Sequence, residues 1–181
     1  MRRGEIEHAR TLLEEVDARA VARGHEYTHM NVLWYLATLE WLAGRWQRAL
    51  EHAIAAHEVT EQIHEHTGFT GRFKALVETD LGLVEEARAS IDEGLAHSQA
   101  FSSEPFVVAT LGVLGRLEFL LGNLPAAGDH LRELPGRLLA GGLNEHSQLT
   151  SPVWREIWRG PITASTGVPD LASYSLSSGR G

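Results

Sequence analysis

The clearest catalytic pattern in the sequence is His25-Glu26-x-x-His29, which matches the H-E-x-x-H motif of zinc hydrolases. On a helix, histidines four residues apart share one face and can both bind zinc, while the glutamate can act as the general base. Gly24 directly precedes the motif, which predicts a loop or a helix start, and no third zinc ligand has a fixed position. We therefore interpret the motif as a solvated turn between two helices, with a zinc-dependent hydrolase as the alternative.

A second group of possible metal ligands consists of His57, Glu61 and His64, which stand at helical spacing and line one face. Imidazole and carboxylate groups bind zinc, so these three residues, with His25 and His29, are the candidates for metal binding. The opposite stripe of the same segment is apolar and predicts the core face. We therefore expect the His/Glu face to point to water, where such pairs are common, and we expect neither a metal centre nor a cofactor.

Trp34 and Trp41 are seven residues apart and so share one face of a predicted helix. This face either packs in the core or lines the inner groove of a superhelix, where exposed tryptophans are favoured interface anchors. Trp34 and Trp41 are therefore the candidate partner-binding residues, whereas Trp46 is expected in the core. The sequence has no G-x-S-x-G motif and no dinucleotide-binding fingerprint, so we expect no enzyme activity.

A repeated pattern predicts the elements that carry these residues. Each of four glycines is followed five residues later by alanine and by apolar residues at helical spacing, with a period of 38 to 40 residues: Gly4/Ala9, Gly44/Ala49, Gly82/Ala87 and Gly122/Ala127. Glycine suits a tight reversal after a helix, and alanine suits a close approach of two helices. The pattern predicts an all-α, tetratricopeptide-like (TPR-like) α-solenoid of antiparallel helix pairs that turn at these glycines.

The two ends of the array depart from this pattern. The first unit has no helix before Gly4, so we expect the apolar face of its helix to be uncovered and available for a partner or for self-association. Pro135-Gly136 is expected to kink or break the helix that follows Gly122. Residues 146–159 are compatible with a further helix, and residues 161–181 are expected to be a disordered Gly/Ser/Thr-rich tail, which leaves 1–160 as the repeat domain.

Three stretches of this sequence resemble a known family: "WLAGRWQRALEHA", "GLVEEARASIDEGLA" and "LGRLEFLLGNLPAAGDHLRELP". They look like the helical-repeat region of large ATP-dependent LuxR-family (maltose-regulator-like) transcriptional regulators, over about residues 4–154. In that family, the region lies between an ATPase and a helix-turn-helix and is thought to act as a sensor and oligomerisation scaffold. The sequence has no G-x-x-x-x-G-K-[ST] loop, and it departs from the family pattern from Arg155 onward, as a truncated or frame-shifted fragment would.

Composition narrows the classes of function that remain. The 181 residues include 16 basic and 24 acidic side chains, and the net charge of −8 argues against direct binding of nucleic acid. There is no Cys, no signal peptide and no membrane-length apolar run, so we expect a cytoplasmic protein, and the preference for Arg over Lys is typical of a bacterial one. The sequence thus predicts a non-catalytic scaffold or sensor module that binds a protein or a small effector on its concave face. A fragment without independent function is the other alternative.

Overall fold

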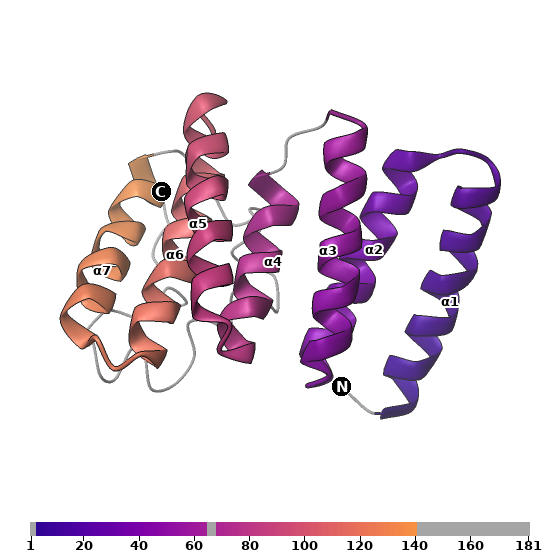
Figure 1. Cartoon of the computed structure of the whole chain (residues 1–181), viewed down its shortest axis with the longest axis horizontal. Helices are drawn as coiled ribbons and strands as arrows, with labels where there is room; N and C mark the ends of the chain where they lie inside the picture. Colours follow the sequence, from indigo (N-terminus) through magenta and orange to yellow (C-terminus); the bar gives the residue numbers. More distant parts are fainter. Residues whose placement is uncertain (1–2, 65–67, 141–181) are drawn as a thin grey trace, which may run out of the picture. The chain divides into compact units, whose positions relative to one another are not determined.

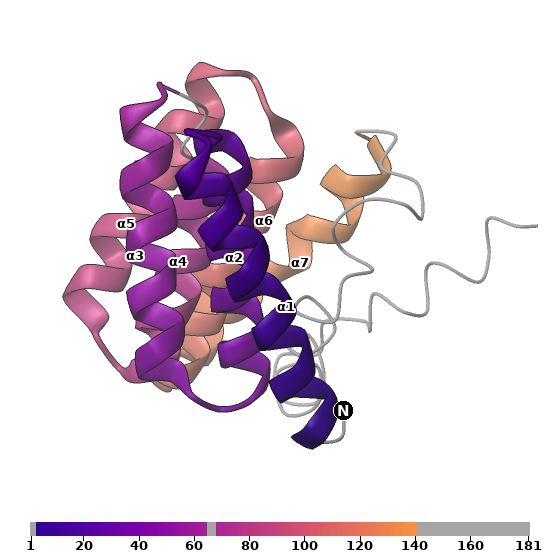
Figure 2. The same cartoon turned by 90° about the vertical axis from the view of Figure 1, so that its right-hand side faces the viewer.

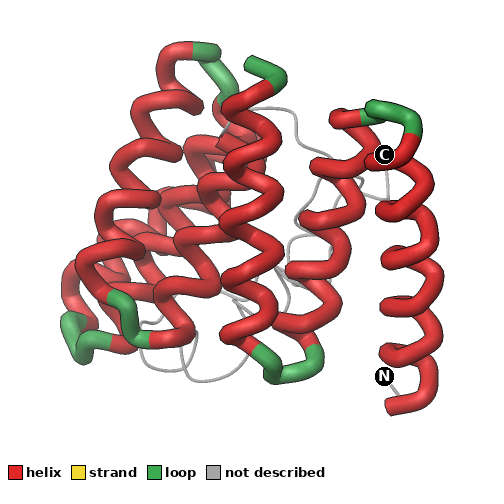
Figure 3. The backbone as a smooth tube through the Cα atoms, turned by 45° about the vertical axis from the view of Figure 1, so that its right-hand side comes forward, coloured by secondary structure: helices red, strands yellow, loops and turns green. Residues whose placement is uncertain are grey.

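The computed structural model describes residues 3–64 and 68–140. Within these two ranges every regular element is an α-helix and no strand occurs, as Figure 3 shows, so the predicted all-α class is confirmed. The helices are α1 (Arg3–Ala22), α2 (Glu26–Leu42), α3 (Trp46–Gln62), α4 (Gly68–Leu81), α5 (Val84–Ala100), α6 (Glu104–Leu120) and α7 (Leu124–Ala140).

The chain divides into two compact units, Met1–His97 and Ser98–Gly181. In the first unit α2 packs against both α1 and α3, and α3 packs against α4; these helices alternate in direction (Figure 1). Most of α5 also belongs to this unit, where Lys74 Nζ of α4 donates a hydrogen bond to Ser90 Oγ of α5 at 2.9 Å. In the second unit α6 packs against α7 (Figure 2).

The helix pairs turn at glycines with left-handed backbone. Gly44 has φ +74°, and the bonds from Gly44 N to Trp41 O (3.0 Å) and from Arg45 N to Glu40 O (2.9 Å) close the end of α2 in a Schellman motif. Gly82 and Gly122 adopt the same conformation, with φ +74° and +78°, so the three predicted turns are confirmed. The turn expected at Gly24 between two helices is also confirmed, with φ +65° before α2. Gly4 differs from the prediction, because it lies inside the first turn of α1.

The alanines five residues after the turning glycines lie where the two helices of a pair come close to each other. Ala49, Ala87 and Ala127 are each 0% exposed, so any larger side chain there would have to displace a neighbour. The equivalent Ala9 of α1 is half-buried. In the second unit, Gly115 of α6 has a similar role, because a Cβ at this position would overlap Leu131 of α7.

Two local predictions are corrected by the structure. α7 continues through Pro135-Gly136 without a break, because burial of Leu131 (1% exposed) and Leu134 (0% exposed) stabilises the helix. These two side chains contribute roughly 3–6 kcal/mol, against a proline cost of about 3 kcal/mol. Trp46 is 41% exposed and not in the core, because it is the first residue of α3 and lies beside the turn at the end of the hairpin.

Other predictions fall outside the described residues: the helix at 146–159 and the tail at 161–181. No helix among those described is both long enough and apolar enough to cross a membrane.

Candidate functional site

The H-E-x-x-H motif does not form a zinc-binding arrangement in the described structure. His25 precedes α2 as its N-cap residue, with φ −87° and ψ 72°. His29 lies in the first turn of α2, where its Nδ1 is 2.6 Å from Asp17 Oδ1 of α1. The ring of His29 therefore joins α1 to α2. Within residues 3–64 and 68–140, neither histidine belongs to a group of three His, Asp or Glu ligand atoms close enough to share a metal ion.

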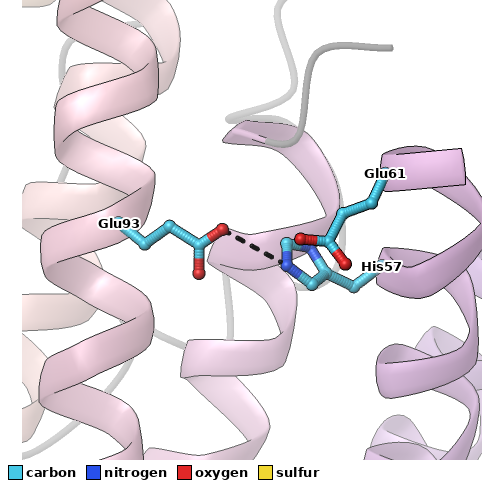
Figure 4. Close-up of side chains that lie close together, drawn as sticks. All are labelled: His57, Glu61 and Glu93. Atoms are coloured by element: carbon cyan, nitrogen blue, oxygen red, sulfur yellow. Dashed lines mark ion pairs between the residues drawn. The ribbon is translucent and has the colours of Figure 1, made fainter. Parts of the chain in front are cut away.

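His57 does not face water as the sequence pattern predicts. It lies on α3, is 7% exposed, and points toward α4 and α5 (Figure 4). Gly71 of α4 lies beside the ring: a Cβ there would be in van der Waals contact with His57 Cε1, at 3.4 Å. The prediction of a solvated His/Glu face is therefore wrong at His57.

A chain of hydroxyl groups orients the His57 ring. Thr60 Oγ1 donates to Ala56 O at 2.7 Å, and Thr70 Oγ1 donates to Thr60 Oγ1 at 3.2 Å. The ring nitrogen His57 Nδ1 lies 3.3 Å from Thr70 Oγ1, within hydrogen-bond distance of this chain of hydroxyls. The other ring nitrogen of His57 is Nε2, which faces Glu93 of α5.

Two carboxylates lie near that Nε2 atom. Glu93 of α5 places Oε1 3.4 Å from His57 Nε2, and Glu61 follows His57 by one turn of α3. One ligand atom from each of the three residues lies within 4.8 Å of the other two (Figure 4). We call His57, Glu61 and Glu93 the α3–α5 cluster. It joins one buried imidazole to two carboxylates that remain open to solvent, since Glu61 is exposed and the Glu93 side chain is 41% exposed.

The sequence pattern identified two members of this cluster and misassigned the third. His64 lies beyond the end of α3 with φ +54° and is exposed, so it does not continue the face of His57 and Glu61. Glu93 takes its place from another helix. The repeat gives no signal for Glu93, because it follows Gly82 by 11 residues whereas His57 follows Gly44 by 13, so the two do not occupy equivalent positions.

The predicted partner-binding tryptophans lie largely between helices. Trp41 is 6% exposed, and its Nε1 donates to Asp80 Oδ2 of α4 at 2.7 Å. The Trp41 and Trp34 rings meet Phe73 of α4 edge-on, with centroid distances of 6.4 and 6.2 Å. Trp34 is half-buried and also contacts Tyr35, which is 52% exposed. This burial favours the core alternative for Trp41 and leaves partner binding by the pair untested.

A buried charge cluster joins α1 to α2 and the turn that follows. Glu40 is 1% exposed; Arg10 Nε donates to its Oε1 at 2.5 Å, and Arg45 Nε donates to its Oε2. Glu7 contacts both arginines from the solvent side. Burial alone raises the pKa of Glu40, but hydrogen bonds from Arg45 and Arg10 outweigh it and lower that pKa below its usual value. All four charges are paired with one another, so this cluster has a structural role.

Comparisons with known proteins bear on the fold. No family model matches the chain, and no curated protein matches it. Among solved structures, it is similar to the crystal structure of BtubC (BKLC) from P. vanneervenii, with a TM-score of 0.62 and 19% sequence identity over 96% of this chain and 71% of that one. At this identity the likeness concerns the helical fold alone.

Proposed function

We propose that the chain is a non-catalytic scaffold or sensor module of stacked TPR-like helix pairs, and that it acts by binding another protein or a small effector. The observation that carries this proposal is the recurrence of one packing unit. A left-handed glycine ends the first helix of each pair, and a fully buried alanine follows five residues later, at Gly44/Ala49, Gly82/Ala87 and Gly122/Ala127. Repeats of this kind build extended surfaces that commonly serve binding.

The surroundings of the catalytic motif support a non-enzymatic role. His29, the second histidine of H-E-x-x-H, is paired with Asp17, and His25 lies outside the helix. A hydrolase would need these two rings on one helical face with a third ligand beside them. We therefore favour the binding module over the zinc-dependent hydrolase.

Exposed apolar side chains on α1 and α2 mark the proposed binding surface. Leu12 and Val16 are one helical turn apart on α1 and are 48% and 38% exposed, while Tyr27 and Tyr35 of α2 are 62% and 52% exposed. Tyrosine is enriched in protein interfaces because it combines a large apolar ring with a polar tip. The surface includes the first helix, whose apolar face was expected to be uncovered and open to a partner or a second copy.

Site-specific photocrosslinking tests this surface. A benzophenone amino acid replaces Tyr27 in one variant and Phe101, which is also 62% exposed, in the matched control. We expect a discrete crosslinked product from position 27 and none from position 101, either with the purified chain alone or with an extract of the cells that produce it. An adduct of the chain with itself identifies a second copy as the partner, and a mixed adduct identifies another protein.

Leu12→Glu/Val16→Glu provides the second arm of this experiment. Both side chains are exposed, so the variant is expected to keep its helical circular dichroism and to lose the product crosslinked at position 27. Identical products from positions 27 and 101, or no product at either position, would refute the binding surface.

The resemblance to the helical-repeat region of ATP-dependent LuxR-family regulators remains part of the proposal, as does a cytoplasmic location. The resemblance implies a role in transcription regulation without direct contact of this chain with nucleic acid. Sequencing the coding DNA on both sides tests it: we expect an ATPase reading frame upstream and a helix-turn-helix downstream. Unrelated flanking genes would remove the support for this family.

A further inference from the structure

We propose that a partly open face of α1 binds residues 146–159 of a second copy of this chain, so that the copies associate head to tail. The inference deepens the proposed function, because it rests on the binding surface at α1 and names a second copy as the partner. The segment 146–159 lies outside the described residues, and its sequence is compatible with a helix.

The first step of the argument is the exposure of α1 at positions that are buried in the equivalent helices. The residues 5, 9 and 12 positions after the glycine of each repeat unit share one helical face, and in α7 this face packs against the first helix of its pair, where Leu131 lies against Gly115 of α6. In α3, α5 and α7 all of these residues are buried: Ala49, Ala53 and Ala56; Ala87, Ile91 and Gly94; Ala127, Leu131 and Leu134. In α1 the same positions are held by Ala9 and Leu13, which are half-buried, and by Val16, which is 38% exposed. The helices that the structure describes therefore cover this face of α1 only in part.

The second step is a sequence pattern shared by the first helices of the other pairs, α2, α4 and α6. Each has a glutamate four residues before the turning glycine, at Glu40, Glu78 and Glu118. These glutamates are buried, with 1%, 4% and 6% exposure, and the backbone carbonyl of each accepts the hydrogen bond that closes the helix end, at 2.8 to 3.0 Å. A glutamate in this place therefore marks the first helix of a pair.

The third step is the recurrence of this pattern outside the described residues. A glutamate four residues before a glycine occurs once more in the sequence, at Glu156 and Gly160, and Gly160 follows Gly122 by 38 residues, which is the repeat period. Residues 146–159 thus have the sequence of a first helix. Pro161 and a Gly/Ser/Thr-rich stretch then interrupt the apolar spacing that follows the other glycines of the repeat, so the sequence does not go on to predict a second helix there.

These steps give each copy two complementary halves of a helix pair. α1 is a second helix with a partly open face, and 146–159 has the sequence of a first helix without its second. Because first helices cover this face in the other pairs, the partner that fits α1 is 146–159 of another copy rather than another α1. Such an interface joins two different surfaces, so it continues into larger assemblies instead of stopping at a two-fold dimer. One helix buries less area than a standard interface, so we expect dissociation constants on the order of micromolar.

Complementation between two blocked variants of the full chain tests this arrangement by sedimentation velocity. Val16→Glu places a charge on the open face of α1. Ile157→Glu places one on the segment, three residues before its glycine, where Trp41 and Thr79 are 6% and 2% exposed in their helices. We expect the wild type to form species larger than a dimer as its concentration rises, and each variant alone to associate about 10-fold or more weakly. An equimolar mixture is expected to form a dimer and nothing larger, because each variant keeps one of the two surfaces.

Ala18→Glu is the matched control, because Ala18 is exposed on the other side of α1. It is expected to associate like the wild type. Each variant is first checked for helical circular dichroism, so that loss of fold is separated from loss of association.

A cysteine pair tests the contact without adding charge. The chain has no cysteine, so a mixture of Val16→Cys and Ile157→Cys copies is expected to give a mixed disulfide-linked dimer on mild oxidation. Ala18→Cys in place of Val16→Cys is expected to give none. This arm decides the question even where Val16→Glu unfolds.

Four results would overturn the inference. A wild type that stays monomeric would exclude a second copy, and the proposed function would still stand if position 27 crosslinked another protein. Association of Val16→Glu equal to that of the wild type would place the contact away from this face of α1. An associating wild type without a dimer in the variant mixture would show a contact between identical surfaces. Equal disulfide yields from positions 16 and 18 would show contact without a defined face.

Discussion

Glu40→Ala tests the buried charge cluster between α1 and α2. Glu40 is 1% exposed and accepts hydrogen bonds from Arg10 and Arg45, one on each carboxylate oxygen. Removing one partner of a buried ion pair costs about 3–5 kcal/mol, because the other charge remains without compensation. The side chains of Arg10 and Arg45 are 15% and 32% exposed, so water relieves part of that penalty. We expect a loss of about 2–4 kcal/mol in the free energy of unfolding.

Urea unfolding followed by circular dichroism near neutral pH measures this loss. The control is Glu15→Ala, which removes an exposed side-chain ion pair with Arg19 whose N···O distance is 3.8 Å and whose side chains are 60% and 64% exposed. This control should change stability by no more than about 0.5 kcal/mol. If Glu40→Ala and Glu15→Ala lowered the free energy of unfolding by the same amount, the burial of Glu40 would not explain its contribution to stability.

The pH dependence of the difference in unfolding free energy between the wild type and Glu40→Ala gives a second check. The pKa of Glu40 is lower in the folded state than its ordinary value of 4.5, so the folded state binds the proton less tightly than the unfolded chain. The stability that the carboxylate contributes is therefore present above about pH 4.5 and is lost as the pH falls through the folded pKa. The stability difference between wild type and Glu40→Ala should shrink on acidification below that value. A difference that stayed constant into this range would contradict the pairing.

Two further predictions concern packing between helices. Gly115→Ala places a methyl group against Leu131 of α7 and is expected to destabilise the chain by about 1–3 kcal/mol in urea unfolding; an unchanged midpoint would mean that Leu131 moves aside without cost. Trp41→Phe removes the hydrogen bond to Asp80 together with buried ring volume and is expected to lower the free energy of unfolding by about 2–3 kcal/mol. Thermal melts monitored by circular dichroism check this, and a stability equal to the wild type would show that Trp41 is not part of the core.

The helices and most of their turns could be predicted because their signals are local. Apolar residues at helical spacing predict a helix, and a glycine predicts the residue with left-handed backbone that ends it, as at Gly44, Gly82 and Gly122. Gly24 was predicted to begin a turn between two helices but was not assigned to the repeat, because no alanine follows it at the repeat distance. Of the kink or break expected at Pro135-Gly136, the break does not occur, because the local cost of proline is outweighed by tertiary burial of leucines on the same helix.

The candidate site was predictable only where one helix supplies its residues. His57 and Glu61 stand one turn apart on α3, so their shared face follows from spacing alone. Glu93 reaches them through the packing of α3, α4 and α5, which the spacing within one segment does not reveal. The burial of His57 likewise comes from packing against α4, where Gly71 and Thr70 lie beside its ring.

The repeat of one helix-pair design is tested most directly by the free energies of unfolding of four Gly→Ala variants. Gly44, Gly82 and Gly122 share positive φ, so alanine at each should cost a similar amount, about 1–2 kcal/mol. Gly4 lies inside α1 with nothing within 4 Å of a Cβ, so alanine there should stabilise by up to about 0.5–1 kcal/mol. Three matching losses and one gain are the expected result. Unequal effects at the three turns, or a loss at Gly4 like theirs, would contradict the repeated unit.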